Sequence, residues 1–253
     1  MRTVREIAKM LDHSLLKPEL TVEQMVAGCG LARRYGLAAA CVKPSEVARA
    51  AEELAGSGVL ATTVVGFPHG ANRTEVKVLE AELAIRDGAG ELDMVMNIGR
   101  LLSGDFDYVE KDIRAVVDAA HAHGVIVKVI FENCYLTDHL KIAACRISER
   151  AGADFIKTAT GFGTGGTVIA DVVLMRKTAG PKVKVKAAGG IRTLDSALPV
   201  MRAGAVRFGT TASDVILDEA EERAREGTLD DIVGGTPAGT PKGAPKGAPK
   251  GEE

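Results

Sequence analysis

The chain has 253 residues, of which 46% are hydrophobic and 26% are charged, and this composition excludes a wholly disordered protein. Its net charge of -2 gives no general attraction to nucleic acid or to an anionic membrane, so we expect neither as a partner. No apolar run approaches the ~20 residues of a membrane-spanning helix, and the start lacks a signal-peptide pattern, which predicts a cytoplasmic location.

Helical stretches that end in glycine recur along the chain, and an apolar run begins after one to three further residues. These stretches end at Gly36, Gly88, Gly124, Gly152 and Gly204. Glycine is the residue expected in a left-handed conformation after a helix, and such short links to a strand are typical of α/β proteins. The five joints therefore predict repeated βα units.

The apolar runs predict eight strands. Their expected starts are near Lys9, Ala38, Ala61, Glu91, Val125, Asp154, Val183 and Ala205. Successive starts lie 22 to 34 residues apart, which leaves room for a helix after each strand. Eight such units predict an α/β fold, a single-domain (β/α)8 TIM barrel. The alternative is a doubly wound open sheet, but no G-x-G-x-x-G opens a helix after the first strand.

Polar residues at the expected helix starts support this register, and the composition then changes near the end of the chain. We expect a capping box formed by Thr21 and Gln24, and a proline at the first helical position at Pro44. We expect N-caps at Thr137, Thr193 and Ser213. From residue 234 the chain repeats a Gly/Ala-Pro-Lys unit that has no apolar anchor. We therefore predict a barrel domain over residues 1–233 and a disordered tail over residues 234–253.

Active residues of such barrels lie at the carboxyl ends of the strands, so polar side chains in the strands are informative. The candidates are Asp12, Cys41, Lys43, Asp93, Asn97, Lys128, Glu132, Lys157, Lys184 and Lys186. In the run VKVK, the period of two places Val183 and Val185 on one face and the two lysines on the other. Helices cover the outside of a barrel, so the valines are expected to face outward and the lysines inward.

Lys157 shares its strand face with Phe155 and can also point inward, on the strand next to Lys186. Neighbouring strands lie ~4.8 Å apart, so matching registers would bring the two amines close together. Two nearby ammonium groups lower the pKa of at least one of them, and a neutral lysine amine attacks carbonyl carbon. Schiff-base chemistry is therefore the leading hypothesis. The alternative is an interior layer of ion pairs in which Asp93 and Glu132 neutralise the lysines.

Two aspartates are candidates for proton transfer and substrate orientation. Asp93 can hold a protonated Lys186 and relay protons, as an aldol reaction requires. Asp12 either orients a substrate hydroxyl or caps the following turn. Glycine-rich turns after the last three strands, TGFGTGG, AAGGIRT and FGTTAS, predict an anion site for a phosphorylated small carbonyl compound.

No cysteine or histidine pattern predicts a metal site or a serine nucleophile. The four cysteines show no C-x-x-C spacing, and the chain has neither H-E-x-x-H nor G-x-S-x-G. His13, beside Asp12, has no visible nucleophilic serine partner. We therefore predict reduced thiols and neither a metal nor a cofactor.

The segments LDHSLLKP, ACVKP, VVGFPHG, ELDMVMNIG, DFIKTATGFG, VKAAGGIRT and RFGTTAS, in this order, resemble the deoxyribose-phosphate aldolase family. The resemblance implies reversible, metal-independent cleavage of 2-deoxyribose 5-phosphate into glyceraldehyde 3-phosphate and acetaldehyde, as in deoxyribonucleotide catabolism. It implies Lys157 as the Schiff-base lysine, and Asp93 and Lys186 as the proton-relay pair. It implies a substrate-binding set of Asp12, Cys41, Thr160, Gly189, Gly190, Gly209 and Thr211. A homo-oligomer, a dimer or larger, is also implied.

Two other functions are compatible with parts of this pattern. A phosphosugar isomerase or epimerase barrel would share the phosphate loops but use a carboxylate or histidine base in place of an imine. A barrel that only binds or acts as a scaffold would require purely structural lysines. Covalent trapping of a substrate on a lysine separates the aldolase from both.

Overall fold

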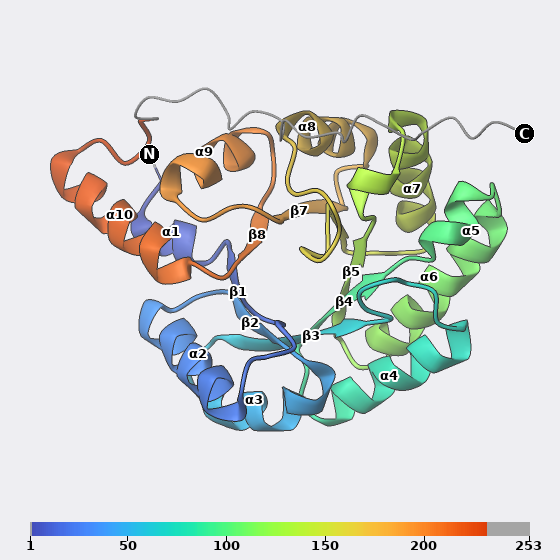
Figure 1. Cartoon of the computed structure of the whole chain (residues 1–253), viewed down its shortest axis with the longest axis horizontal. Coiled ribbons are helices and arrows are strands. Elements are labelled where there is room, and N and C mark those ends of the chain that lie inside the picture. The colour runs from blue at the N-terminus through green and yellow to red at the C-terminus, as the bar shows by residue number, and fades with distance from the viewer. Residues whose placement is uncertain (1, 232–253) are drawn as a thin grey trace, which may run out of the picture.

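The computed structural model describes residues 2–231, which form a closed barrel of eight parallel strands in chain order (Figure 1). The strands are β1 (Leu11–Leu15), β2 (Ala39–Val42), β3 (Leu60–Val65), β4 (Glu91–Val95), β5 (Ile126–Ile130), β6 (Phe155–Lys157), β7 (Lys184–Ala188) and β8 (Arg207–Thr210). Each observed start lies within two residues of its prediction. The predicted TIM barrel is confirmed, and the open sheet is excluded because β8 pairs with β1. The predicted tail lies outside the described residues.

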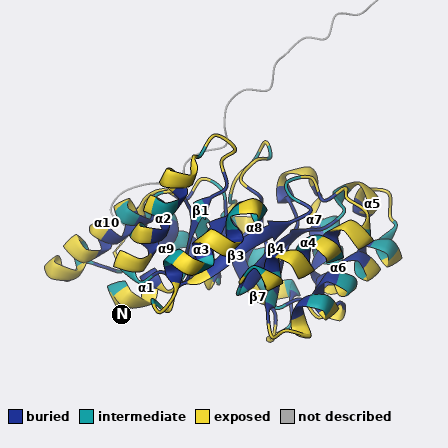
Figure 2. Cartoon of the chain, turned by 90° about the horizontal axis from the view of Figure 1, so that it is seen from below, coloured by how far each residue is buried: buried dark blue, intermediate teal, exposed yellow. Residues whose placement is uncertain are grey.

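Helices surround the barrel (Figures 1 and 2). They are α1 (Val4–Ala8), α2 (Val22–Tyr35), α3 (Val47–Leu54), α4 (Thr74–Arg86), α5 (Ile98–Leu102), α6 (Phe106–His121), α7 (Asp138–Arg150), α8 (Ile169–Thr178), α9 (Leu194–Arg202) and α10 (Ser213–Glu226), with short 3-10 helices η1 (Pro44–Glu46) and η2 (Asn133–Tyr135). Within residues 2–231, no helix has both the length and the apolar character needed to cross a membrane. Figure 2 shows the buried strands inside and the exposed helix faces outside, so the core lies between these two layers.

The glycines at the helix ends have the backbone conformation that the sequence predicts. Gly36 ends α2 with φ of 62°, and its N–H donates to carbonyl oxygens of the last helical turn. The other predicted joints also have positive φ, at Gly88, Gly124, Gly152 and Gly204. A side chain is strained in this conformation, which glycine adopts freely, so these residues set where each helix stops and the next strand begins.

Four of the five predicted helix starts are confirmed and one differs. Thr21 forms its capping box with Gln24, and Thr137 and Thr193 cap α7 and α9. Pro44 opens the 3-10 helix η1, which precedes α3. The N-cap predicted at Ser213 is wrong, because Ala212 occupies that position and Ser213 is the first helical residue.

A buried ion pair outside the barrel ties α4 and α6 to the end of β4. Lys77 Nζ lies 2.6 Å from Asp112 Oδ2 and donates to the carbonyl oxygen of Val95 at 3.0 Å. Thr74 donates to the other Asp112 oxygen at 2.8 Å. Both charged side chains are fully buried, and burial lowers the pKa of Lys77 despite its partner. This pair is not among the residues predicted from the sequence.

We predict that Asp112→Ala lowers the free energy of unfolding by about 3–5 kcal/mol, because it leaves the Lys77 ammonium buried without a carboxylate. Glu75→Ala is the control, since it removes an exposed partner of Arg73, and it should change stability by less than about 1 kcal/mol. Urea unfolding measures both variants. A similar small loss in both would show that the buried pair does not hold these helices.

Candidate active site

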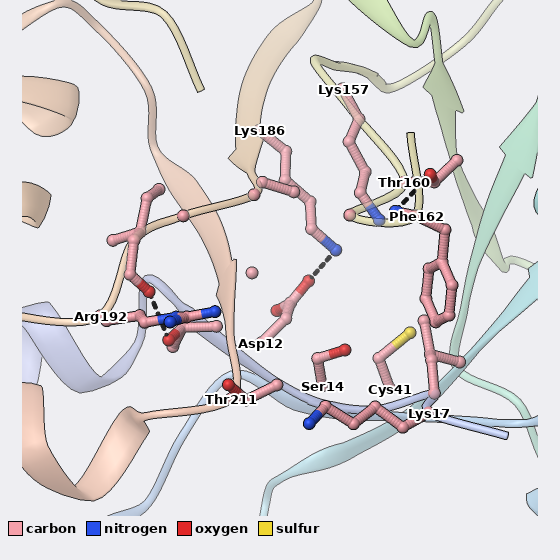
Figure 3. A pocket seen from close by; sticks show the side chains of 18 residues that line it. Asp12, Ser14, Lys17, Cys41, Lys157, Thr160, Phe162, Lys186, Arg192 and Thr211 are labelled. Atoms are coloured by element: carbon pink, nitrogen blue, oxygen red, sulfur yellow. Dashed lines mark hydrogen bonds and ion pairs between the residues drawn. The ribbon is translucent and has the colours of Figure 1, made fainter. Parts of the chain in front are cut away.

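A cavity of about 540 Å³ opens at the carboxyl ends of the strands, where the sequence analysis expects the site (Figure 3). Nine of the ten site residues that the family resemblance implies line it: Asp12, Cys41, Lys157, Thr160, Lys186, Gly189, Gly190, Gly209 and Thr211. The tenth, Asp93, is buried and hydrogen-bonded to the two lysines. The structure therefore brings together the ten residues that the family resemblance implies, whereas Lys43, Asn97, Glu132 and Lys184, also candidates from the strand pattern, do not line the cavity.

Lys157 and Lys186 lie side by side, which the Schiff-base hypothesis requires of the registers of β6 and β7. They are direct partners in the pairing of β6 with β7. Their amines share one oxygen: Asp93 Oδ2 lies 2.7 Å from Lys157 Nζ and 2.6 Å from Lys186 Nζ. The other oxygen of Asp93 accepts from Lys128 at 2.8 Å. A single carboxylate therefore contacts three lysines.

These contacts belong to a closed ring of alternating charge inside the barrel, which we call the charge ring. Its members, in order, are Arg207, Glu91, Lys128, Asp93, Lys186 and Asp12. Glu91 Oε2 lies 2.6 Å from both Arg207 Nη2 and Lys128 Nζ. Asp12 closes the ring, because Arg207 Nη2 lies 2.7 Å from its Oδ1 and Lys186 pairs with its Oδ2.

The charge ring is neutral by itself. It holds three carboxylates and three basic groups, so their formal charges cancel. Lys157 is attached to the ring through Asp93 and is the seventh ionisable group. A protonated Lys157 would leave these seven groups with one excess positive charge, which is costly away from water.

The directions in which the pKa values of Lys157 and Lys186 shift agree with this count. Burial lowers the pKa of Lys157, and the neighbouring Lys186 adds to the effect while Asp93 opposes it. Burial also disfavours the charged form of Lys186, but Asp12 and Asp93 outweigh it and raise the pKa of Lys186. The site thus contains one lysine biased toward the neutral amine beside one held as ammonium, which suits nucleophilic attack with a proton donor nearby.

The predicted interior ion-pair layer exists, but its membership differs from the prediction. Glu132 lies outside it, because the backbone turns to φ of 57° after β5 and the carboxylate instead accepts from Thr160 N at 3.2 Å. Asp12 is a ring member and not a turn cap. Glu91 and Arg207 were missed, although Glu91 precedes Asp93 by two residues and shares its strand face.

One wall of the cavity is apolar. Cys41 packs in a cluster with Leu16, Val64 and Phe67, and Phe67 makes an edge-to-face contact with Phe162, with ring centroids 5.3 Å apart. Burial and the charge of Asp93 raise the pKa of the Cys41 thiol to about 11, so this thiol is neutral at pH 7. Cys41 therefore contributes an apolar surface beside the Lys157 amine.

The glycine-rich turns after β7 and β8 form the opposite side of the cavity. Gly189 and Gly190 have φ of 97° and 82°, and a Cβ on Gly189 would meet Gly166 Cα at 3.0 Å. Their chain leads to the start of α9, and the turn containing Thr211 leads to the start of α10. Backbone N–H groups of glycine turns and helix starts attract anions, so this side is suited to a phosphate group.

His13 has the serine partner that was not visible in the sequence. Its Nδ1 lies 2.9 Å from Ser213 Oγ, and both side chains are buried. His13 follows Asp12, so its side chain points away from the barrel interior, toward α10. The pair does not line the cavity; it fixes the start of α10 behind the Thr211 turn.

Comparisons with known proteins agree with this geometry. The family described as DeoC/LacD family aldolase matches residues 4–214. The deoxyribose-phosphate aldolase of Thermococcus gammatolerans is 53% identical over 217 residues, which cover 85% of this chain and 96% of that protein. The enzyme of the same name from Caldanaerobacter subterraneus is 51% identical over 218 residues, covering 86% and 94%. The solved structure of the Aeropyrum pernix deoxyribose phosphate aldolase has a TM-score of 0.81 at 32% identity, covering 87% and 92%.

Proposed function

The chain belongs to the DeoC/LacD family of aldolases and is a lyase with deoxyribose-phosphate aldolase activity, and we propose that Lys157 forms the Schiff base of its reaction. The observation that supports Lys157 is its place: it lines the cavity and is the ionisable group left over when the charge ring is complete. A neutral amine is required to attack an aldehyde carbon, and this position favours one.

The reaction divides into steps that these residues can perform. The Lys157 amine adds to the C1 aldehyde of 2-deoxyribose 5-phosphate, and loss of water gives an iminium ion. A base removes the proton of the C3 hydroxyl, the C2–C3 bond breaks, and its electron pair moves toward the iminium nitrogen. Glyceraldehyde 3-phosphate leaves, C2 of the enamine takes a proton, and water releases acetaldehyde from Lys157.

We assign proton transfer in these steps to Asp93 and Lys186. Lys186 is held as ammonium between two carboxylates, so it can donate a proton and recover one. Asp93 contacts Lys157 and Lys186 through the same oxygen, which gives a direct path between the imine nitrogen and the donor. Asp12 faces the cavity beside Lys186 and is assigned to orienting a substrate hydroxyl.

The remaining predicted residues are assigned to substrate binding. Gly189, Gly190, Gly209 and Thr211 lie on the side of the cavity suited to phosphate. Cys41 belongs to the apolar wall and borders the two-carbon fragment that stays on Lys157. Thr160 lines the cavity, and the buried Glu132 holds its backbone N–H.

We predict that Lys157→Leu abolishes cleavage of 2-deoxyribose 5-phosphate while the far-ultraviolet circular dichroism spectrum is retained. Borohydride reduction with acetaldehyde should add a two-carbon fragment to Lys157 of the parent protein, located by peptide mass spectrometry. Lys184→Leu is the matched control, because Lys184 is the first residue of β7, at the end of the strand away from the cavity, and does not line it.

Normal turnover in Lys157→Leu, or an adduct on another lysine, would contradict the assignment. A phosphosugar isomerase or epimerase, the alternative considered from the sequence, would give no borohydride adduct at all. The same experiment therefore separates the two reactions.

We further propose that the chain forms a homo-oligomer through α4. The Aeropyrum pernix relative is described as tetrameric. In this chain Val76, Leu79 and Leu83 lie on one face of α4 and are 49%, 55% and 39% exposed. A stripe of three large exposed apolar side chains on one helix is a candidate subunit contact.

Leu79→Glu should dissociate this oligomer, because it places a charge in the centre of the stripe. Light scattering coupled to size-exclusion chromatography measures the mass of each protein against the 26.4 kDa of one chain. Val215→Glu on α10 is a control with comparable exposure, 44%, on a different helix. A monomeric parent protein, or an unchanged mass for Leu79→Glu, would refute the proposal.

A cytoplasmic location is also proposed. All four cysteines are free thiols, which fits a reducing compartment. Fractionation of the source cells with an antibody against the chain tests this location, and recovery in a secreted or membrane fraction would refute it.

A further inference from the structure

We propose that Arg207 is a positioning residue for the reaction: by closing the charge ring it commits Asp12 and Glu91 to other cations, and so leaves Lys157 without a counterion of its own. This inference rests on the proposed role of Lys157 as the imine-forming residue. It concerns a side chain that does not line the cavity and that no step of the reaction contacts.

Arg207 lies at the end of the barrel opposite the cavity. It is the first residue of β8, whereas the cavity lies at the carboxyl ends of the strands. Its guanidinium contacts two carboxylates at once, Asp12 Oδ1 at 2.7 Å and Glu91 Oε2 at 2.6 Å, and also lies near the ring of Phe155. The side chain is 13% exposed, so the charge is largely buried with its partners.

These contacts leave few carboxylate oxygens for Lys157. Glu91 Oε2 is shared by Arg207 and Lys128, and the two oxygens of Asp12 contact Arg207 and Lys186. The Lys157 amine is left with Asp93 Oδ2, which Lys186 also occupies. Among the described residues, the carboxylate oxygen that the Lys157 amine contacts is therefore shared with a second lysine.

Glu132, the buried carboxylate after β5, is hydrogen-bonded to Thr160. The other charged or titratable groups near Lys157 lie on the surrounding strands. They are Asp93 on β4, Lys186 on β7, the neutral thiol of Cys41 on β2, and, through their contacts with Asp93 and Lys186, Lys128 on β5 and Asp12 on β1. The inward-facing residues Thr62 and Val64 of β3 carry no charge. The charge state of Lys157 thus depends on the total charge of the ring.

If Arg207 acts through the charge of the ring, the direction in which protonation of Lys157 changes follows from the charge that a substitution removes. A merely structural role predicts no such direction. Arg207→Met removes a positive charge and leaves the ring negative, so protonation of Lys157 becomes more favourable. Glu91→Gln removes a negative charge and leaves the ring positive, so protonation of Lys157 becomes less favourable. The double variant Glu91→Gln/Arg207→Met restores a neutral ring.

The measurement is the pH dependence of kcat/KM for cleavage of 2-deoxyribose 5-phosphate, whose acidic limb reports loss of the proton from Lys157 in the free enzyme. We expect Arg207→Met to move this limb up by about one pH unit, which is about a tenfold loss of kcat/KM on the limb. Glu91→Gln should move the limb down. The double variant and Arg207→Lys should return it toward the parent position.

Arg223→Met is the matched control. Arg223 is 14% exposed and lies 2.8 Å from Asp195 between α9 and α10, so it resembles Arg207 in burial and pairing but lies outside the barrel interior. Its loss should lower stability without moving the limb. Circular dichroism identifies any variant that fails to fold; if Arg207→Met does, Glu91→Gln and the double variant still carry the test.

Two results would overturn the inference: shifts of the same direction in Arg207→Met and Glu91→Gln, or reduced rates with an unmoved limb in both. Borohydride labelling of the parent protein with acetaldehyde is run alongside. An adduct on Lys157 combined with an unmoved limb would refute the role of Arg207 while the proposed function stands. The lack of that adduct would refute the proposed function itself.

Discussion

The buried carboxylate of Asp93 is the interaction on which the site depends. It contacts Lys128, Lys157 and Lys186 from three successive strands of the barrel, and the three lysines hold its pKa well below the usual range despite burial. Removing any of these charges from water is costly unless partners are in place, so the barrel must keep the registers of β4 to β7 for the interior to be stable. The same registers place Lys157 and Lys186 side by side.

This arrangement links the stability of the barrel interior to its chemistry. The charge ring neutralises itself and fixes six side chains, and the ring does not balance the charge of an ionised Lys157, which is attached to it through Asp93. The pocket side of that amine is bordered by the apolar wall near Cys41 and by the glycine-rich turns. A reactive amine, a proton donor and an anion-binding surface therefore meet at one end of a rigid scaffold, as in other TIM barrels.

The sequence predicted the barrel and most of the site because local patterns carry that information. Glycine-terminated helices marked the strand starts, and the period of two in VKVK and in FIK indicated which lysines face inward. Glu91 and Arg207 were missed because their partners lie on strands far apart in the chain, and a single arginine in a strand resembles a surface residue. Glu132 was misplaced because a left-handed residue after β5 redirects its side chain, which no periodicity shows.

The most direct test of a neutral Lys157 is carbon-13 NMR of protein labelled at the lysine ε-carbons, with Lys157→Arg identifying the signal. The structure predicts that the pKa of Lys157 read from this signal lies below the ordinary lysine value, whereas the pKa of Lys186 lies above it. A Lys157 signal that titrates near the ordinary lysine pKa of ~10.4 would contradict the proposed origin of its reactivity.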